Sequence, residues 1–205
     1  MTLPPSPTPD TAPPRVGDFP ATLSVLAVLV VFKAFALGAS GSISALAGLV
    51  ESCLALGASG IIWSLPRWRT ALPPVDDRVT EAMALLIQSG MTLSAALIVG
   101  VIGFLGIFEP RPVGGGFWAV GAIVLSLGVK AAFAVYTARR PQPSRATTFA
   151  YSDLVPTFVV LLGVTAGALL KAPGLDAAAA LVVAVWLFWG ALPQIAAAAR
   201  LLGKD

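Results

Sequence analysis

Six long apolar runs, separated by short polar stretches, dominate the chain from residue 19 onward. Each run has about 19–27 residues, enough for an α-helix to cross a hydrocarbon core of about 30 Å. The runs are rich in Ala and Leu and lack two-residue alternation, which disfavours strands. A tight turn is expected over residues 38–42, between the first two runs. The predicted spans are Phe19–Leu37, Ile43–Leu65, Ala82–Phe108, Gly115–Tyr136, Thr148–Leu170 and Asp176–Ala199.

The composition of the 205 residues excludes most soluble classes of protein. Hydrophobic residues make up 57% of the chain and charged residues 11%, with a mean hydropathy of +0.88. A soluble domain carries about 25% charged residues to cover its surface. Seven of the 17 prolines lie in the first 20 residues. We therefore predict an all-α fold, a polytopic six-helix membrane bundle over residues 19–202, preceded by a disordered Pro-rich cytoplasmic tail over residues 1–18.

The basic residues predict the orientation in the membrane. If the six spans cross the membrane in alternating directions, nine of the 13 Lys and Arg residues fall on one side of it and only Arg111 and Lys171 on the other. Lys33 and Lys130 lie within the spans. The positive-inside rule places the basic side, with both termini, in the cytoplasm. This distribution also accounts for the pI of about 9.4 without a nucleic-acid partner. The nine residues are Arg15, Arg67, Arg69, Arg78, Arg139, Arg140, Arg145, Arg200 and Lys204.

Several reactive groups are missing from the sequence. There is no His, and the single cysteine, Cys53, is expected to be a small buried hydrophobe. A Gly-rich phosphate loop and a Gly-x-Ser-x-Gly elbow are also absent. We therefore expect no enzymatic activity, no ATP as energy source, no closed zinc site and no resident cofactor. Glycines in the third and fifth spans are expected to serve close helix packing.

Four ionisable residues fall within the predicted spans: Lys33, Glu51, Lys130 and Asp153. A charge at bilayer depth costs about 2.5–3.5 kcal/mol even on insertion scales, so each one needs a reason. Glu51 and Asp153 could lie at the same depth and form an oxygen-rich site for a hard cation. Alternatively, each acid pairs with Lys33 or Lys130 and locks the bundle. Both interpretations remain open from the residues alone, since transport sites also use such pairs.

Ser152 and Glu81 are further, accessory candidates for this site. Pro156 has no N–H, so it frees the carbonyl of Ser152, which could bind a cation or an ordered water. An ordinary proline kink is the alternative. Glu81 opens the third span, where it either joins the polar interior with Gln88 or simply favours the helix N-terminus.

The order of these features resembles the cation diffusion facilitator family. The resemblance covers residues 20–205 and is most specific in the first of the stretches that carry it. They are FKAFALGASGSISALAGLVESCLALGAS, EAMALLIQSG, VLSLGVKAAFAVYTARR, FAYSD and LDAAAALVVAVWLFWGALPQIAAAARLLGKD. It implies a six-helix membrane antiporter that exports divalent cations in exchange for protons. The cytoplasmic domain that follows the last span in this family has no counterpart, so we expect none here.

The resemblance also implies where the metal would bind. The family places two acids four residues apart on helix two, and His or Asp followed four residues later by Asp on helix five. Of these four positions, Glu51 and Asp153 keep a ligand, whereas Ala55 and Phe149 cannot coordinate a metal. Two carboxylates with carbonyls, hydroxyls or water suit a harder ion such as Mn²⁺, Mg²⁺ or Fe²⁺. Proton coupling would run through Glu51 or Asp153.

Three functions follow from these expectations. The first is cation efflux by proton antiport through a reduced site. The second is a transport-inactive or regulatory subunit that partners a complete transporter, favoured by Ala55 and Phe149. The third is a cavity adapted to another substrate. The lipid bilayer, a metal cation and protons are the expected partners, together with a second copy of the chain or a partner transporter. The expected location is the bacterial inner membrane.

Overall fold

The computed structural model describes residues 19–69, 77–139 and 154–203, and these residues form six α-helices. The predicted all-α bundle is confirmed. Five of the helices are long and apolar enough to cross a membrane, and the sixth, α6, has 15 described residues. The chain is therefore an integral membrane protein. The helices are α1 (Phe19–Ser40), α2 (Ile43–Arg69), α3 (Asp77–Phe108), α4 (Gly116–Ala138), α6 (Leu154–Ala168) and α7 (Pro173–Leu202).

Three sequence expectations need correction at the ends and surfaces of these helices. The predicted turn over residues 38–42 shrinks to two residues, because α1 continues to Ser40 and only Gly41 takes a left-handed φ of 63°. Helix α3 begins at Asp77, five residues before the predicted span, so Glu81 lies in its second turn. Cys53 is exposed on α2, because it falls beside the buried stripe that contains Glu51 and Ser52.

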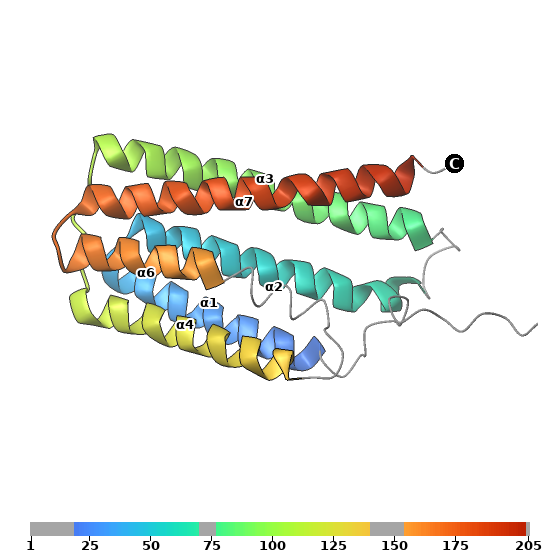
Figure 1. Cartoon of the computed structure of the whole chain (residues 1–205), viewed down its shortest axis with the longest axis horizontal. Coiled ribbons are helices and arrows are strands. Elements are labelled where there is room, and N and C mark those ends of the chain that lie inside the picture. Colours follow the sequence, from blue (N-terminus) through green and yellow to red (C-terminus); the bar gives the residue numbers. More distant parts are fainter. Residues whose placement is uncertain (1–18, 70–76, 140–153, 204–205) are drawn as a thin grey trace, which may run out of the picture.

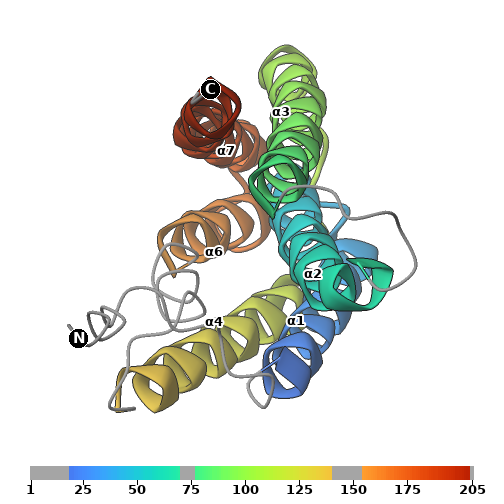
Figure 2. The same ribbon diagram turned by 90° about the vertical axis from the view of Figure 1, so that its right-hand side faces the viewer.

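The helices run alternately up and down, and the three described connections, 41–42, 109–115 and 169–172, lie at one end of the molecule (Figure 1). Helices α3 and α7 pack along each other as a pair. Viewed end-on, this pair lies on one side, α1 and α4 lie on the other, and α2 and α6 run between them (Figure 2). The middle of the bundle is therefore bounded by α1, α2, α4 and α6.

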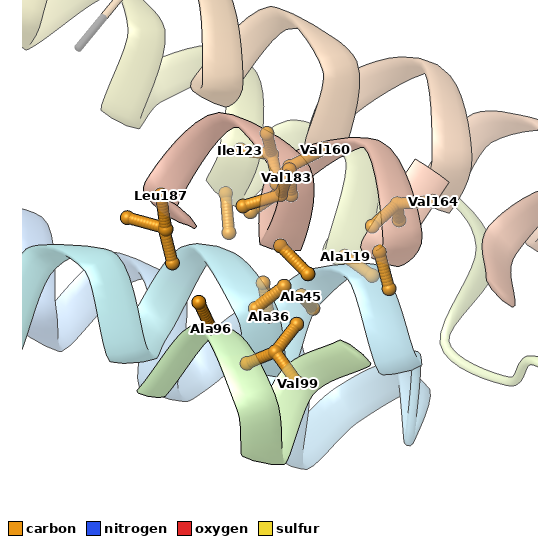
Figure 3. Close-up of a cluster of buried hydrophobic side chains, with 14 residues drawn as sticks. Ala36, Ala45, Ala96, Val99, Ala119, Ile123, Val160, Val164, Val183 and Leu187 are labelled. Carbon is orange, nitrogen blue, oxygen red and sulfur yellow. The ribbon is translucent and has the colours of Figure 1, made fainter. Parts of the chain in front are cut away.

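The core is built from small side chains, with the larger apolar ones outside. Ala36, Ala45, Val160 and Val183 are all completely buried where the helices meet (Figure 3). Phe104, Phe117 and Trp189, by contrast, are more than half exposed. Lipid is as apolar as these large side chains, so burying them gains little, and close packing of small residues holds the helices instead.

Glycines allow the closest approaches, as predicted from the sequence. A Cβ added to Gly163 on α6 would lie 2.6 Å from the Ala179 Cβ and 2.7 Å from the Ser44 Oγ. At Gly103 on α3, it would lie 3.2 Å from the Leu181 Cγ. The glycines of α3 and α6 thus bring both helices against α7, and α6 also against α2.

Candidate functional site

A cluster of charged side chains lies inside the bundle, where α1, α2, α4 and α6 meet. Lys33 of α1 donates a hydrogen bond of 3.0 Å to Glu51 Oε2 of α2. Lys130 of α4 places its Nζ 3.5 Å from the other carboxylate oxygen, Oε1. Both ammonium groups also contact the Thr157 hydroxyl of α6, at 2.7 Å from Lys130 and 3.4 Å from Lys33. We call these four residues the ion centre.

Helical periodicity brings each member of the ion centre to the inner face of its helix. Glu51 follows buried Ser44 and Ala47 by seven and four residues, which places all three on one side of α2. Lys130 lies between buried Ser126 and Ala134 on α4 in the same way. On α6, Thr157 shares its stripe with buried Val160 and Val164. The polar groups therefore lie within the same stripes that form the apolar core.

The ion centre is almost completely shielded. Lys33 is 0% exposed, Lys130 3% and Glu51 4%. Glu51 lies eight residues into α2, about 12 Å from its start, and its short side chain is enclosed by the neighbouring helices. Its negative charge is stabilised by two ammonium groups, which compensates the cost of burying a carboxylate. Among the four residues themselves, two positive charges face one negative charge.

Of the two interpretations left open by the residues, the structure shows ion pairing for Glu51, and with both lysines rather than with one of them. The assignment of Glu51 as a metal ligand stays a prediction. Asp153, Ser152 and Phe149 fall outside the described residues, as does the carbonyl that Pro156 was expected to free. Glu81 lies on α3, but its side chain is likewise outside what is described. Within residues 19–69, 77–139 and 154–203, no group of three or more His, Cys, Asp or Glu side chains could hold a metal.

Sequence reasoning missed Thr157 as a member of the ion centre. A signal was present, because Thr157 is four residues after Asp153 and therefore one helical turn along the same predicted span. Buried ammonium groups need acceptors, and a hydroxyl on the inner face of a neighbouring helix supplies one without adding charge. Its partners come from helices distant in sequence, and the sequence pattern does not identify them.

A second buried acid, Asp176, joins the start of α7 to the start of α2. Its Oδ1 accepts hydrogen bonds from the Ser42 hydroxyl at 2.6 Å, the Ser44 hydroxyl and the Ser44 N–H. Its Oδ2 accepts the Ile43 N–H at 2.8 Å. The carboxylate therefore caps the N-terminus of α2 while lying in the first turn of α7, where both helix dipoles favour a negative charge. The sequence pattern indicates Asp176 only as the start of a span.

Besides the contacts of Asp176, the α1–α2 turn contacts α6 and the α3–α4 connection. The Ser44 hydroxyl lies 3.5 Å from the Val160 carbonyl of α6, one turn along that helix from Thr157. On the other side of the turn, Gly114 N–H donates to the Ser40 carbonyl at 2.8 Å. The cap thus connects α2 to α6 and α7 two helical turns before Glu51, and sets the position from which α2 enters the bundle.

Comparison with known proteins supports the similarity to cation-efflux pumps. No protein-family profile matches the sequence. The chain is 31% identical over 147 residues to "Cation-efflux pump FieF" of Yersinia enterocolitica, an alignment that covers 66% of this chain and 48% of the pump. The chain therefore spans about half the length of the curated relative it matches. An integral membrane protein with a buried ion centre is thus similar in sequence to a cation-efflux pump, in agreement with the family resemblance of its helices.

Proposed function

We propose that the protein carries divalent cations across a bacterial inner membrane in exchange for protons, with Glu51 of the ion centre as a cation ligand. The observation that supports the proposal most directly is the buried Glu51 carboxylate, which already binds two ammonium cations inside the bundle. A site that holds lysine ammonium groups by charge and oxygen contacts has the chemistry to hold a cation cargo. Cargo and ammonium groups compete for the same carboxylate.

The oxygen ligands around Glu51 favour a hard cation. Thr157 contributes a hydroxyl oxygen to the centre, and Asp153, four residues earlier in the sequence, is the second carboxylate expected from the family resemblance. Among the described residues, the buried hydroxyls of Ser52 and Ser126 have no hydrogen-bond partner. Ser52 adjoins Glu51 in sequence, and Ser126 lies one turn from Lys130. Carboxylate and hydroxyl oxygens suit Mg²⁺, Mn²⁺ or Fe²⁺ better than softer ions.

The same lysines favour a second function, that of a transport-inactive or regulatory subunit of a cation-efflux system. In this alternative, Lys33 and Lys130 permanently replace the cargo and the ion centre only stabilises the bundle. Ala55, at a position where the family carries a ligand, favours this alternative too. The partner would be a complete transporter, or a second copy of this chain. In either case we expect both termini in the cytoplasm, no enzymatic activity and no resident cofactor.

Transport assays in proteoliposomes separate the two functions. The purified chain is reconstituted with an outward-directed proton gradient, Mg²⁺, Mn²⁺, Fe²⁺ and Zn²⁺ are added outside one at a time, and internal pH is recorded. We expect uptake of at least one hard cation, accompanied by proton efflux. Replacing Glu51 by Gln removes the anionic ligand while keeping its shape, so uptake should fall at least about tenfold.

Glu109→Gln is the matched control, because Glu109 is an exposed acid in the α3–α4 connection. Its uptake should equal that of the wild type. Cation uptake that is the same in the wild type and in Glu51→Gln would contradict the proposed site. Wild-type vesicles without flux, combined with stable co-purification of a transporter, would establish the regulatory alternative instead.

A further inference from the structure

The Thr157 hydroxyl is shared by the two lysines of the ion centre. Its Oγ1 accepts a hydrogen bond from Lys130 at 2.7 Å and one from Lys33 at 3.4 Å, and the residue is 0% exposed. The contacts of each ammonium group thus include two acceptors from the described part of the chain, the Glu51 carboxylate and the Thr157 hydroxyl. A lysine that loses its contact with Glu51 therefore keeps a polar partner without any movement of the helices.

We propose that Thr157 is a positioning residue, an acceptor that holds the lysine ammonium groups when a cation takes Glu51, and that it thereby sets the apparent affinity for the cation. This inference rests on the proposed function. It adds a role for Thr157 that neither the family resemblance nor the similarity to an efflux pump assigns. The cation itself need not contact Thr157 for the residue to act in this way.

The energetic argument compares the centre with and without cargo. Without cargo, Lys33 donates a hydrogen bond to Glu51, Lys130 forms an ion pair with it, and both lysines bond to Thr157. The loss of the Thr157 hydroxyl then removes one of several contacts. With a cation on Glu51, that carboxylate is no longer available to the lysines. The hydrogen bonds to Thr157 then contribute more to stabilising the buried ammonium charges. Hydrogen bonds to charged groups in buried sites are stronger than neutral ones. Removal of the hydroxyl therefore raises the free energy of the cargo-bound state more than that of the empty state.

Helices α2 and α6 pack closely beside the Lys33 ammonium group. A Cβ added to Gly48 of α2 would lie 3.1 Å from the Val160 Cγ2 of α6 and 3.5 Å from the Lys33 Nζ. Helices α2 and α6 are thus in close contact beside the ammonium group, one turn before Glu51. Thr157 comes from the same α6 and lies 3.4 Å from the Lys33 Nζ, so its hydroxyl is within reach of the ammonium group at this close contact.

Kinetics of Thr157 variants test the role. Thr157→Val preserves the shape of the side chain and removes the hydroxyl, whereas Thr157→Ser keeps the hydroxyl and removes a methyl group. In the proteoliposome assay we expect Thr157→Val to raise the KM for the cation about tenfold, with the maximal rate within about twofold of wild type. Thr157→Ser should stay close to the wild-type KM.

Thr137→Val is the matched control. Thr137 of α4 is also buried, but its hydroxyl bonds to the Phe133 and Ala134 carbonyls of its own helix. The KM of this variant should be unchanged. A wild-type KM in Thr157→Val would overturn the inference, and so would an equal increase in Thr157→Ser, because the loss would then come from packing.

A binding measurement separates this inference from the proposed function. In detergent solution, the cation concentration that gives half of the cation-dependent rise in Tm should increase about tenfold in Thr157→Val as well. A wild-type protein with neither uptake nor a cation-dependent Tm overturns the proposed function and this inference together. A responsive wild type with an equally responsive Thr157→Val overturns the inference alone.

Discussion

At the scale of residues, the ion centre depends on one carboxylate that serves two ammonium groups. Lys33 and Lys130 both contact Glu51, so the carboxylate is the common partner of both cations. Removing one partner of a buried ion pair costs more than the pair contributes, because the remaining charge stays buried. The three charged residues are therefore unequal, and Glu51 is the most sensitive position.

This asymmetry predicts an order of stabilities in variants of the ion centre. Glu51→Gln should lower the free energy of unfolding by about 4 kcal/mol, since two ammonium groups lose their carboxylate. Lys33→Met should lower it by about 2 kcal/mol, because Lys130 still faces Glu51. Thermal and denaturant unfolding in detergent measures both, with Glu109→Gln as the exposed control. Equal losses for the two variants would argue against the shared-carboxylate arrangement.

At the scale of elements, Asp176 joins the start of α7 to the start of α2. Its buried carboxylate accepts two backbone N–H groups and two hydroxyls from residues 42–44. A helix N-terminus leaves its first N–H groups without partners, and inside a membrane protein such groups are costly. One side chain of α7 thus accepts hydrogen bonds from the N–H groups at the start of α2, and this contact holds the starts of the two helices together.

We expect Asp176→Ala to lower the free energy of unfolding by about 3 kcal/mol, since two N–H groups and two hydroxyls lose a charged acceptor. The control, Glu109→Ala, removes an acid at the same end of the molecule that is exposed, and should change stability by less than about 0.5 kcal/mol. Hydrogen exchange of the Ile43 and Ser44 amides should also accelerate in Asp176→Ala. Unchanged exchange at these amides would show that the cap does not protect them.

At the scale of the whole molecule, the described connections lie at one end and the basic helix termini lie toward the other (Figure 1). Arg139 follows α4 at one end, and Glu109 follows α3 at the opposite end. Both side chains are exposed. The alternation of the helices links the orientation of any one terminus to that of the others, so labelling two positions decides the topology.

The single cysteine makes the topology test simple. In a Cys53→Ser background, Glu109→Cys and Arg139→Cys variants are expressed in bacterial cells and treated with a membrane-impermeant maleimide. The positive-inside distribution predicts labelling of position 109 in intact cells, and of position 139 only after the cells are permeabilised. The reverse result would place the termini outside the cytoplasm and overturn the predicted orientation.

The helices were predictable because their cause is local. An apolar run of sufficient length can satisfy its backbone groups in lipid only as a helix, so length and hydropathy predicted each of the six elements. Two helix ends differ from the predicted spans. Helix α3 begins at polar Asp77, before its apolar run starts, and α1 ends at polar Ser40, after its apolar run has ended. Cys53 is exposed, contrary to the expectation from its apolar surroundings, because a lipid-facing stripe is as apolar as a buried one and hydropathy does not separate them.

By itself, the sequence determined that this chain is a polytopic helical membrane protein, that its helices pack through small residues, and that Glu51, Lys33 and Lys130 lie within the membrane. Only the tertiary structure decided that Glu51 serves both lysines, that Thr157 completes the centre and that Asp176 caps a neighbouring helix. Lys33 and Thr157 are 124 residues apart, and Ser42 and Asp176 are 134 residues apart. Such contacts depend on which helix faces meet, which is set by packing between whole helices and not by the residues next to each partner in the chain.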